Sequence, residues 1–356
     1  MDVGIQLVFA SHGWQGVSDR QVYDEELRLA LLAEELGFDV AWAVEHHFFD
    51  YSFCPDNTEL LAYLAAKTGR MDLGTAAVIM PWNHPLRVAE KISLLDYLSG
   101  GRLRFGMGRG LSRREYAAFE GIDMGESRER FDESAAMVVR ALETGFIEGE
   151  GPYYPQPRIE IRPRPERSFK DRLYAVAGSP DSIDSAARLG AAMVMFADRP
   201  WETRMPSIEH HREQYREIHG AEAPPPMTAD FLFCHPDADY AKEAGTRYLS
   251  AYLDSIVEHY EVMGDHFANT KGYDAYAEGA EKLKSAGTSG MLKGFQKATA
   301  SGTPDQILET LSARKELMGS FELASSFRFG GIPYEEAEAS LRLFAKEVLP
   351  VIKTWD

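Results

Sequence analysis

The chain has 356 residues, of which 44% are hydrophobic and 26% charged, a composition typical of a folded globular protein. Its net charge of −18 argues against nucleic acid and anionic membranes as partners, because both attract basic surfaces. Two cysteines, Cys54 and Cys234, cannot build a disulfide framework. The chain has neither a signal-like start nor an apolar run long enough to cross a membrane. We therefore expect a cytoplasmic protein.

Eight short apolar or β-branched runs, most followed by a segment with helical spacing, predict alternating strands and helices. The strands are expected at Val3–Phe9, Val40–Val44, Leu73–Met80, Arg102–Met107, Leu173–Ala177, Ala192–Phe196, Met227–Cys234 and Phe321–Phe327. The helices are expected at Asp19–Leu36, Asn57–Thr68, Pro85–Leu98, Arg128–Leu142, Asp181–Leu189, Glu202–His219, Ala238–Met263, Pro304–Met318 and Tyr334–Ile352. Eight such units in the α/β class fit a closed (β/α)8 TIM barrel better than an open doubly wound sheet.

Two insertions interrupt the alternation, and no domain boundary is visible, so one domain is expected over residues 1–356. Residues 144–171 are rich in proline and contain short alternating segments, which predict a hairpin. Residues 264–302 are rich in glycine and polar side chains. Gly37 is expected to end the first helix.

The active site of a β/α barrel lies at the carboxyl ends of its strands, and several predicted strands end in polar or glycine-rich segments. Glu45, His46 and His47 follow the second strand. A histidine there could be a general acid or base, and the alternative is a histidine that only completes local hydrogen bonds. No metal site is expected, because the chain contains neither an H-E-x-x-H motif nor paired cysteines. His210 and His211, in a predicted helix, are expected on a solvated face.

Two further segments favour a phosphorylated or planar ligand. Gly106–Gly110 would let the backbone approach such a ligand closely. Gly178–Ser182 opens a helix after a strand, where free N–H groups and hydroxyls can bind an anion, although a plain helix cap explains the same residues. Arg109 and Arg128 could supply positive charge to a phosphate.

Several of these segments closely resemble the bacterial luciferase family of two-component flavin monooxygenases, above all its α subunit. The matching segments are Glu45–Phe48, Leu73–Glu90, Leu94–Arg102, Arg104–Leu111, Asp123-Met124, Ser127-Arg128, Thr270–Asp274, Gly302–Pro304, Leu343-Phe344 and Val348–Pro350. The resemblance extends over nearly the whole chain and implies the luciferase-like β/α barrel.

The resemblance also implies roles for individual residues. Reduced FMN would lie across the barrel mouth, with Ala76 and Ala77 forming a non-prolyl cis peptide beneath the ring. His46 resembles the family's catalytic histidine, and Glu115 replaces another acidic residue near the flavin. The residues implied to bind the cofactor are Glu45, Ala76, Ala77, Gly108, Arg109, Arg128, Ala177, Gly178, Ser179 and Ser182. Residues 264–302 resemble the mobile lid over the active site.

The implied reaction uses FMNH2 from a separate flavin reductase, forms a C4a-hydroperoxide with O2, and oxygenates a small aldehyde- or ketone-like substrate. A dry, closable site would protect that adduct from water. The resemblance further implies a dimer, with His47 and Glu90 meeting across the interface.

Three departures from luciferase argue against light emission and long-chain aldehyde specificity. Gly108 replaces the family's reactive cysteine, Gly178 replaces a glutamate, and small residues around Ala197 replace a tryptophan. A true luciferase-type alkanal monooxygenase remains an alternative, as do an F420-dependent oxidoreductase of the same fold and a flavin-binding or structural subunit without chemistry.

Overall fold

In the computed structural model, which describes residues 1–11 and 16–355, eight parallel strand positions close into a barrel, as the sequence predicts. The strands are β1 (Val3–Leu7), β2 (Val40–Ala43), β3 (Asp72–Thr75), β4 (Val78–Ile79), β5 (Leu103–Gly108), β8 (Leu173–Val176), β9 (Ala192–Phe196), β10 (Met227–Phe231) and β11 (Glu322–Ser326). They run in the order β3-β2-β1-β11-β10-β9-β8-β5-β4, and pairing of β3 with β5 closes the ring. The predicted third strand is divided into β3 and β4 at Ala76-Ala77.

The helices surround the barrel, and most of their bounds lie within a few residues of the prediction. They are α1 (Asp19–Leu36), α2 (Asn57–Ala65), α3 (Pro85–Leu98), α4 (Arg113–Tyr116), α5 (Ser127–Thr144), α6 (Pro180–Leu189), α7 (Met205–His219), α8 (Ala238–His259), α9 (Asp274–Ala286), α10 (Thr288–Ala298), α11 (Pro304–Met318), α12 (Tyr334–Glu347) and α13 (Leu349–Ile352). Gly37 ends α1 with φ of 96°, as expected. The predicted last helix is interrupted at Val348, two residues before Pro350.

Both insertions form regular structure. The first contains the expected hairpin, in which β6 (Phe146–Gly149) pairs antiparallel with β7 (Gln156–Glu160). The second differs from its glycine-rich composition, because α9 and α10 occupy most of residues 264–302. Buried Phe295 and Ala298 anchor α10, so apolar contacts outweigh the cost of its glycines.

One expectation about the outer helices was wrong. His210 is exposed, but His211 is buried and its Nε2 lies 3.1 Å from the carbonyl oxygen of Ala191. His211 shares the inner face of α7 with Ile208 and Tyr215, at the spacing of one helical stripe.

A tryptophan fills much of the barrel interior. Trp42 points inward from β2 and is opposed by Gly74 in the β2–β3 register. A Cβ atom on Gly74 would lie 2.1 Å from the Trp42 ring, and one on Gly4 of β1 would lie 2.7 Å from it. The two glycines therefore make room for the indole, which also packs against Tyr174 with ring centroids 4.8 Å apart.

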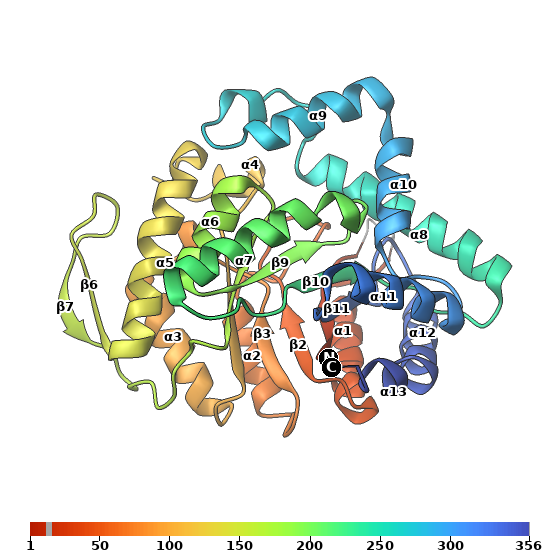
Figure 1. The fold of residues 1–356 in the computed structure, drawn as a ribbon, viewed down its shortest axis with the longest axis horizontal. Coiled ribbons are helices and arrows are strands. Elements are labelled where there is room, and N and C mark those ends of the chain that lie inside the picture. Colours follow the sequence, from red (N-terminus) through yellow and green to blue (C-terminus); the bar gives the residue numbers. More distant parts are fainter. Residues whose placement is uncertain (12–15, 356) are drawn as a thin grey trace.

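The two ends of the barrel differ in what covers them. In Figure 1, α9 and α10, in cyan and blue, lie over one end of the barrel on the same side as α4. The termini lie next to each other away from α9, and the Met1 amino group donates to the Trp355 carbonyl oxygen at 2.8 Å. Among the described helices, none has the length and apolar character needed to span a bilayer.

A buried ion pair joins α11 to the barrel. Arg314 donates from both terminal nitrogens to the two carboxylate oxygens of Asp230, each at 2.7 Å, and both side chains are at most 1% exposed. Thr228 and the Ala298 carbonyl accept further bonds from the same guanidinium. The pair is therefore nearly fully hydrogen-bonded, the condition under which a buried pair is tolerated.

Replacing Arg314 with Ala is expected to reduce the free energy of unfolding by about 3–5 kcal/mol, because Asp230 would be left buried and uncompensated. The matched control is Arg342→Ala, which breaks an exposed pair with Glu338 on α12 and should cost less than about 1 kcal/mol. Urea unfolding at pH 7 measures both, and equal losses would contradict the assignment.

Candidate active site

The carboxylate of Glu115 brings together segments from two strand ends. Glu115 lies on α4, which follows β5, and its Oε1 accepts the backbone N–H of His47 at 2.7 Å. The same oxygen lies 3.1 Å from Nδ1 of His46, which follows β2. Ser112 caps α4 through the N–H of Glu115. Both predicted catalytic residues therefore meet at the barrel mouth.

Glu115 is fully buried, and burial alone would raise its pKa. The neighbouring imidazoles of His46 and His259 outweigh burial and hold the pKa of Glu115 well below its usual range. The carboxylate is therefore ionised at neutral pH and can orient the Nδ1–H tautomer of His46, which leaves Nε2 available as a base.

His259, the last residue of α8, is a site residue that sequence reasoning missed. Its Nε2 lies 3.7 Å from Oε2 of Glu115, and its ring stacks on Tyr51 at 4.4 Å. The sequence placed it inside a predicted helix, and only the folded chain brings it to a residue 144 positions away. His46, Glu115 and His259 have ligand-type atoms within 4.8 Å of one another. The expectation that no metal takes part remains a prediction.

Glu45 links the backbone segments that form the mouth of the barrel. It accepts the backbone N–H of Ile79 at 2.9 Å and the amide of Asn83 at 3.1 Å, and Nε2 of His47 lies 3.5 Å away. Burial raises the pKa of Glu45, while these donors oppose the rise. The side chain thus joins the end of β2 to the segment after β4.

The peptide between Ala76 and Ala77 is cis, as the resemblance implied. Gly108 lies beside it, because a Cβ on Gly108 would be 3.3 Å from the Cβ of Ala77 and 3.1 Å from Cδ1 of Ile79. A larger residue at position 108 would therefore require Ile79 to move, which gives a packing reason for glycine there.

Arg109 and Arg128 lie close enough to influence each other. The pKa of Arg128 is lowered, first by burial and then by the charge of Arg109. Arg128 contacts Asp132 at 3.5 Å and donates to Ser185 at 3.3 Å, but its Nε is buried without a hydrogen-bond partner. Two adjacent cations with an unsatisfied donor are suited to an anion.

The two predicted phosphate serines are engaged in a helix cap. Ser182 Oγ accepts the N–H groups of Gly178 and Ser179 at 3.0 and 2.8 Å and donates to the Ser179 carbonyl at 2.7 Å. The hydrogen bonds of these serines are therefore those of a helix cap, the alternative to an anion site. Ala177 is buried, and its N–H bonds to Val194 of β9.

The segment between α8 and α9 is anchored directly over the two arginines. Arg109 donates to the Gly272 carbonyl at 3.0 Å, and its guanidinium lies 4.1 Å from the ring centre of Tyr273. The Tyr273 hydroxyl donates to the Gly110 carbonyl at 3.1 Å and lies 3.0 Å from the hydroxyl of Ser127. Tyr273 is fully buried, so its ring acts as the main anchor of this segment.

His47 and Glu90, which the resemblance places in contact across a subunit interface, each have other partners within this chain. His47 is largely buried, with its ring 5.3 Å from Trp82 and 5.1 Å from Phe119. Glu90 lies on α3 and pairs with Arg87. Their meeting across a subunit interface remains a prediction.

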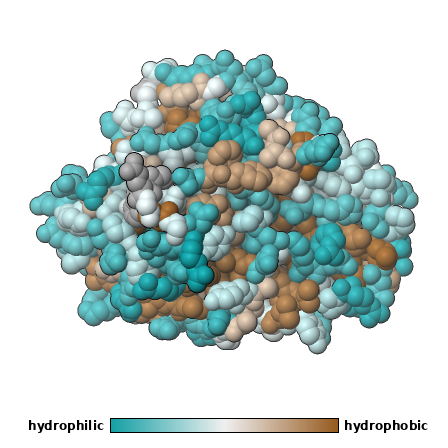
Figure 2. Space-filling model, turned by 180° about the vertical axis from the view of Figure 1, so that it is seen from behind, coloured by the Kyte–Doolittle hydropathy of each residue, from teal (hydrophilic) through white to brown (hydrophobic). Residues whose placement is uncertain are grey.

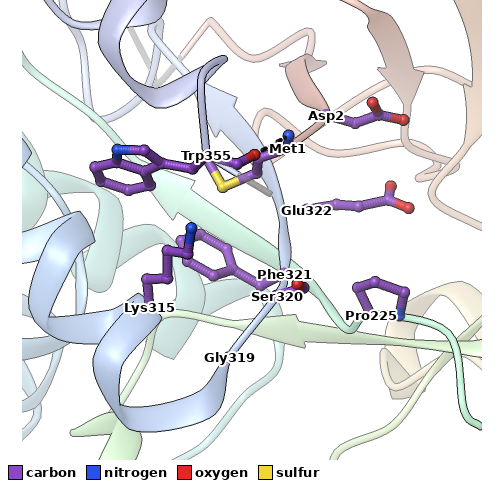
Figure 3. A pocket seen from close by; sticks show the side chains of 9 residues that line it. All are labelled: Met1, Asp2, Pro225, Lys315, Gly319, Ser320, Phe321, Glu322 and Trp355. Atoms are coloured by element: carbon purple, nitrogen blue, oxygen red, sulfur yellow. Dashed lines mark hydrogen bonds between the residues drawn. The ribbon is translucent and has the colours of Figure 1, made fainter.

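A cavity of about 300 Å3 lies at the other end of the barrel, where β1, β10 and β11 begin. In Figure 3 the carboxylates of Asp2 and Glu322 lie on one side of it, and Lys315 and Trp355 on the other. Burial raises the pKa of Glu322 to about 7, although the charge of Arg104 opposes the rise. This cavity is separate from the residues around Glu115, which follow the opposite ends of the strands.

The comparisons decide the family. A sequence profile of the luciferase-like monooxygenases matches residues 1–320. The chain belongs to the luciferase-like monooxygenase family. It is therefore an enzyme of the flavin-dependent monooxygenase type. It is 26% identical to the alkanal monooxygenase alpha chain of Photorhabdus luminescens over 94% of both chains. It is 24% identical to the oxygenase component of the flavin-dependent trigonelline monooxygenase of Acinetobacter baylyi, over 94% of this chain and 91% of the relative.

Several solved structures share the fold. The monooxygenase RslO1 of Streptomyces bottropensis is 27% identical, with a TM-score of 0.80 and 99% of both chains covered. The oxygenating constituent of 3,6-diketocamphane monooxygenase from Pseudomonas putida, determined with FMN, has a TM-score of 0.73 at 20% identity, with 98% of both chains covered. Two F420-dependent enzymes, at 20% and 16% identity, also share the fold, so barrel geometry alone does not select the flavin.

Replacing Glu115 with Gln is expected to flatten the loss of stability on acidification. A carboxyl whose pKa is depressed in the folded state stabilises the fold above its unfolded pKa, and that stabilisation is lost as the pH falls. Urea unfolding at pH 3.5 and pH 6 measures the effect. The control Glu243→Gln removes an exposed carboxyl on α8 and should keep the wild-type slope. If Glu115→Gln also kept the wild-type slope, the assignment of a negative charge to Glu115 would be contradicted.

Proposed function

We propose that this chain is the oxygenase of a two-component system that takes FMNH2 from a separate flavin reductase and oxygenates a small aldehyde- or ketone-like substrate. One observation carries the proposal: a buried, ionised Glu115 holds His46 at the same barrel mouth as Ala76-Ala77, Gly108 and the paired arginines. The single domain and the cytoplasmic location expected from the sequence belong to the same proposal.

The residues present fit FMN. The guanidinium groups of Arg109 and Arg128 would hold the phosphate. The buried Nε–H of Arg128 has no hydrogen-bond partner and could donate to it. Gly178 lies beside α9, because a Cβ there would be 3.4 Å from the hydroxyl of Tyr276. The cis peptide and Gly108 would present a flat surface of backbone and methyl groups to the ring.

The chain's own contribution to the reaction is control of protons and water. The flavin, when bound, supplies the activation of O2. His46, oriented by Glu115 through Nδ1, would accept or return a proton at Nε2 as the oxygen atom is transferred. The segment anchored by Tyr273 would cover the mouth and exclude water, which would otherwise divert the reaction to peroxide.

Supply of reduced flavin from another protein is supported by the trigonelline relative, which is the oxygenase component of its monooxygenase. A dimer is supported by exposed apolar side chains on α2 and α3, namely Tyr63, Leu94, Tyr97 and Leu98. Figure 2 also shows brown, apolar patches open on the face opposite α6 and α7. Such patches are common at subunit interfaces.

The proposal takes the enzyme to be non-luminescent, because Gly108, Gly178 and the small residues around Ala197 stand where the resemblance places the cysteine, glutamate and tryptophan of luciferase. A Cβ at position 108 would lie 3.1 Å from Cδ1 of Ile79, so any larger residue there would need Ile79 to shift slightly. Light from reduced FMN, O2 and a long aldehyde would restore the alkanal monooxygenase alternative.

Stopped-flow mixing tests the reaction class. The purified protein with anaerobically reduced FMN is mixed with oxygenated buffer, and the return of oxidised-flavin absorbance is followed. The absorbance should return at least about ten times more slowly than for free reduced FMN, because a protected site raises the barrier to decay by about 1.4 kcal/mol or more. Return at the free rate, together with selective binding of F420, would overturn the proposal.

Replacing Arg128 with Met should weaken FMN binding by about 10- to 100-fold, the effect of losing a charge-assisted hydrogen bond to phosphate. Arg140→Met is the matched control, since Arg140 lies on the same helix but contacts the Glu148 carbonyl near the hairpin. Fluorescence titration with FMN and with riboflavin measures both variants. An equal loss for riboflavin, which has no phosphate, would contradict the assigned role.

A further inference from the structure

We propose that His259 is a positioning residue for His46, and that the two imidazoles share one proton through the carboxylate of Glu115. The coupling is a property of the chain without flavin. Its consequence for oxygen transfer rests on the proposed function, in which His46 manages the proton.

The geometry places Glu115 between the two rings. Oε1 faces Nδ1 of His46 at 3.1 Å, and Oε2 faces Nε2 of His259 at 3.7 Å. The two imidazole planes are perpendicular, with centroids 5.4 Å apart. Each histidine therefore addresses a different oxygen of one carboxylate, and neither blocks the other.

Among the described residues, the ring nitrogens of His259 have no hydrogen-bond partner that would compete with Glu115. Both of its ring nitrogens and Oε2 of Glu115 are buried without a hydrogen-bond partner. The residue is 2% exposed, so bulk water cannot serve it. A buried donor or acceptor without a partner is destabilising, and closing the 3.7 Å gap between Nε2 of His259 and Oε2 of Glu115 would satisfy both atoms at once.

The surrounding charges allow only one imidazolium. Glu115 supplies a single negative charge, and Arg114 adds a positive charge that also acts on His259. The other neighbours are aromatic: Tyr51 stacks on His259, and Tyr260 packs against the same ring at 4.7 Å. Two protonated histidines beside Arg114 would repel one another in this poorly solvated place.

The two positions of the proton leave His46 in different states. In one state the shared proton is on Nε2 of His46, which makes that ring the imidazolium while its Nδ1–H faces Oε1 of Glu115 and His259 is neutral. In the other state the shared proton makes His259 the imidazolium, its Nε2–H faces Oε2 of Glu115, and His46 is neutral with its proton on Nδ1. His259 therefore sets the proton affinity of His46 without touching the reacting atoms.

His259 also connects this pair to the lid. It is the last residue of α8, and residues 264–302 follow almost at once. Arg113 of α4 makes two bonds to Glu261, at 3.0 and 2.6 Å, and so holds the end of α8 against the helix that carries Glu115. A displacement of the lid would thus alter the distance between His259 and Glu115.

Histidine 15N NMR of the flavin-free protein tests the coupling. In His259→Gln, the titration midpoint of His46 should rise by about one pH unit, because a neighbouring positive charge is gone and Glu115 is no longer shared. In His46→Gln, the midpoint of His259 should rise by the same amount, because coupling between two sites is reciprocal. Signals are assigned by their disappearance in each variant.

His211→Gln is the matched control, because His211 is equally buried but lies against the carbonyl of Ala191, the residue before β9. It should leave the midpoint of His46 within about 0.2 units of wild type. If His259→Gln is folded by circular dichroism but also leaves the His46 midpoint within about 0.2 units of wild type, the coupling is refuted. His259→Asn replaces it if the first variant does not fold.

A second readout tests the role in the reaction. The pH profile of flavin reoxidation should move in His259→Gln by the shift that NMR measures for His46. An unmoved profile would overturn the positioning role while leaving the proposed function intact. Wild-type protein that shows coupling by NMR but no delayed reoxidation would instead refute the proposed function alone.

Discussion

The closed ring of parallel strands is the constraint on which the rest of this molecule depends. Once β3 pairs with β5, all eight carboxyl ends meet at one rim, and residues far apart in the chain become neighbours. The ring can close at this diameter because Trp42 fills its interior between Gly4 and Gly74. A different filling would change the spacing of the strands, and with it the distances among His46, Glu115 and the arginines.

At that rim a single carboxylate does more than any other group to fix local structure. Glu115 orients the His46 ring, holds the turn that follows β2 through the N–H of His47, and faces the end of α8. It is stable as an ion in a buried place because its partners offset the loss of solvent. Glu45, two residues before His47, joins the next loop in a similar way.

The strands and most helices were predictable because barrel strands are short apolar runs bounded by turn residues, as at Val40–Ala43, and because caps such as Gly37 mark helix ends. The resemblance suggested separate roles for His46 and Glu115, and only the folded chain shows that the two side chains meet. His259 was not predictable, since nothing local separates it from a surface histidine and its contact depends on how α8 crosses the rim. The helices in 264–302 were missed because their glycines are compensated by distant packing, and the burial of His211 because one helical face was misassigned.

The bond between Arg109 and the Gly272 carbonyl has a consequence for affinity. A phosphate that takes this N–H must first displace a carbonyl that already satisfies it, so the exchange returns less free energy than a new bond would. The guanidinium is also stacked on Tyr273, which must shift or be shared. Such competition lowers what this one N–H contributes to the binding of an anion. It also couples any anion that takes this N–H to the release of Gly272 from Arg109, and so to the position of the segment between α8 and α9.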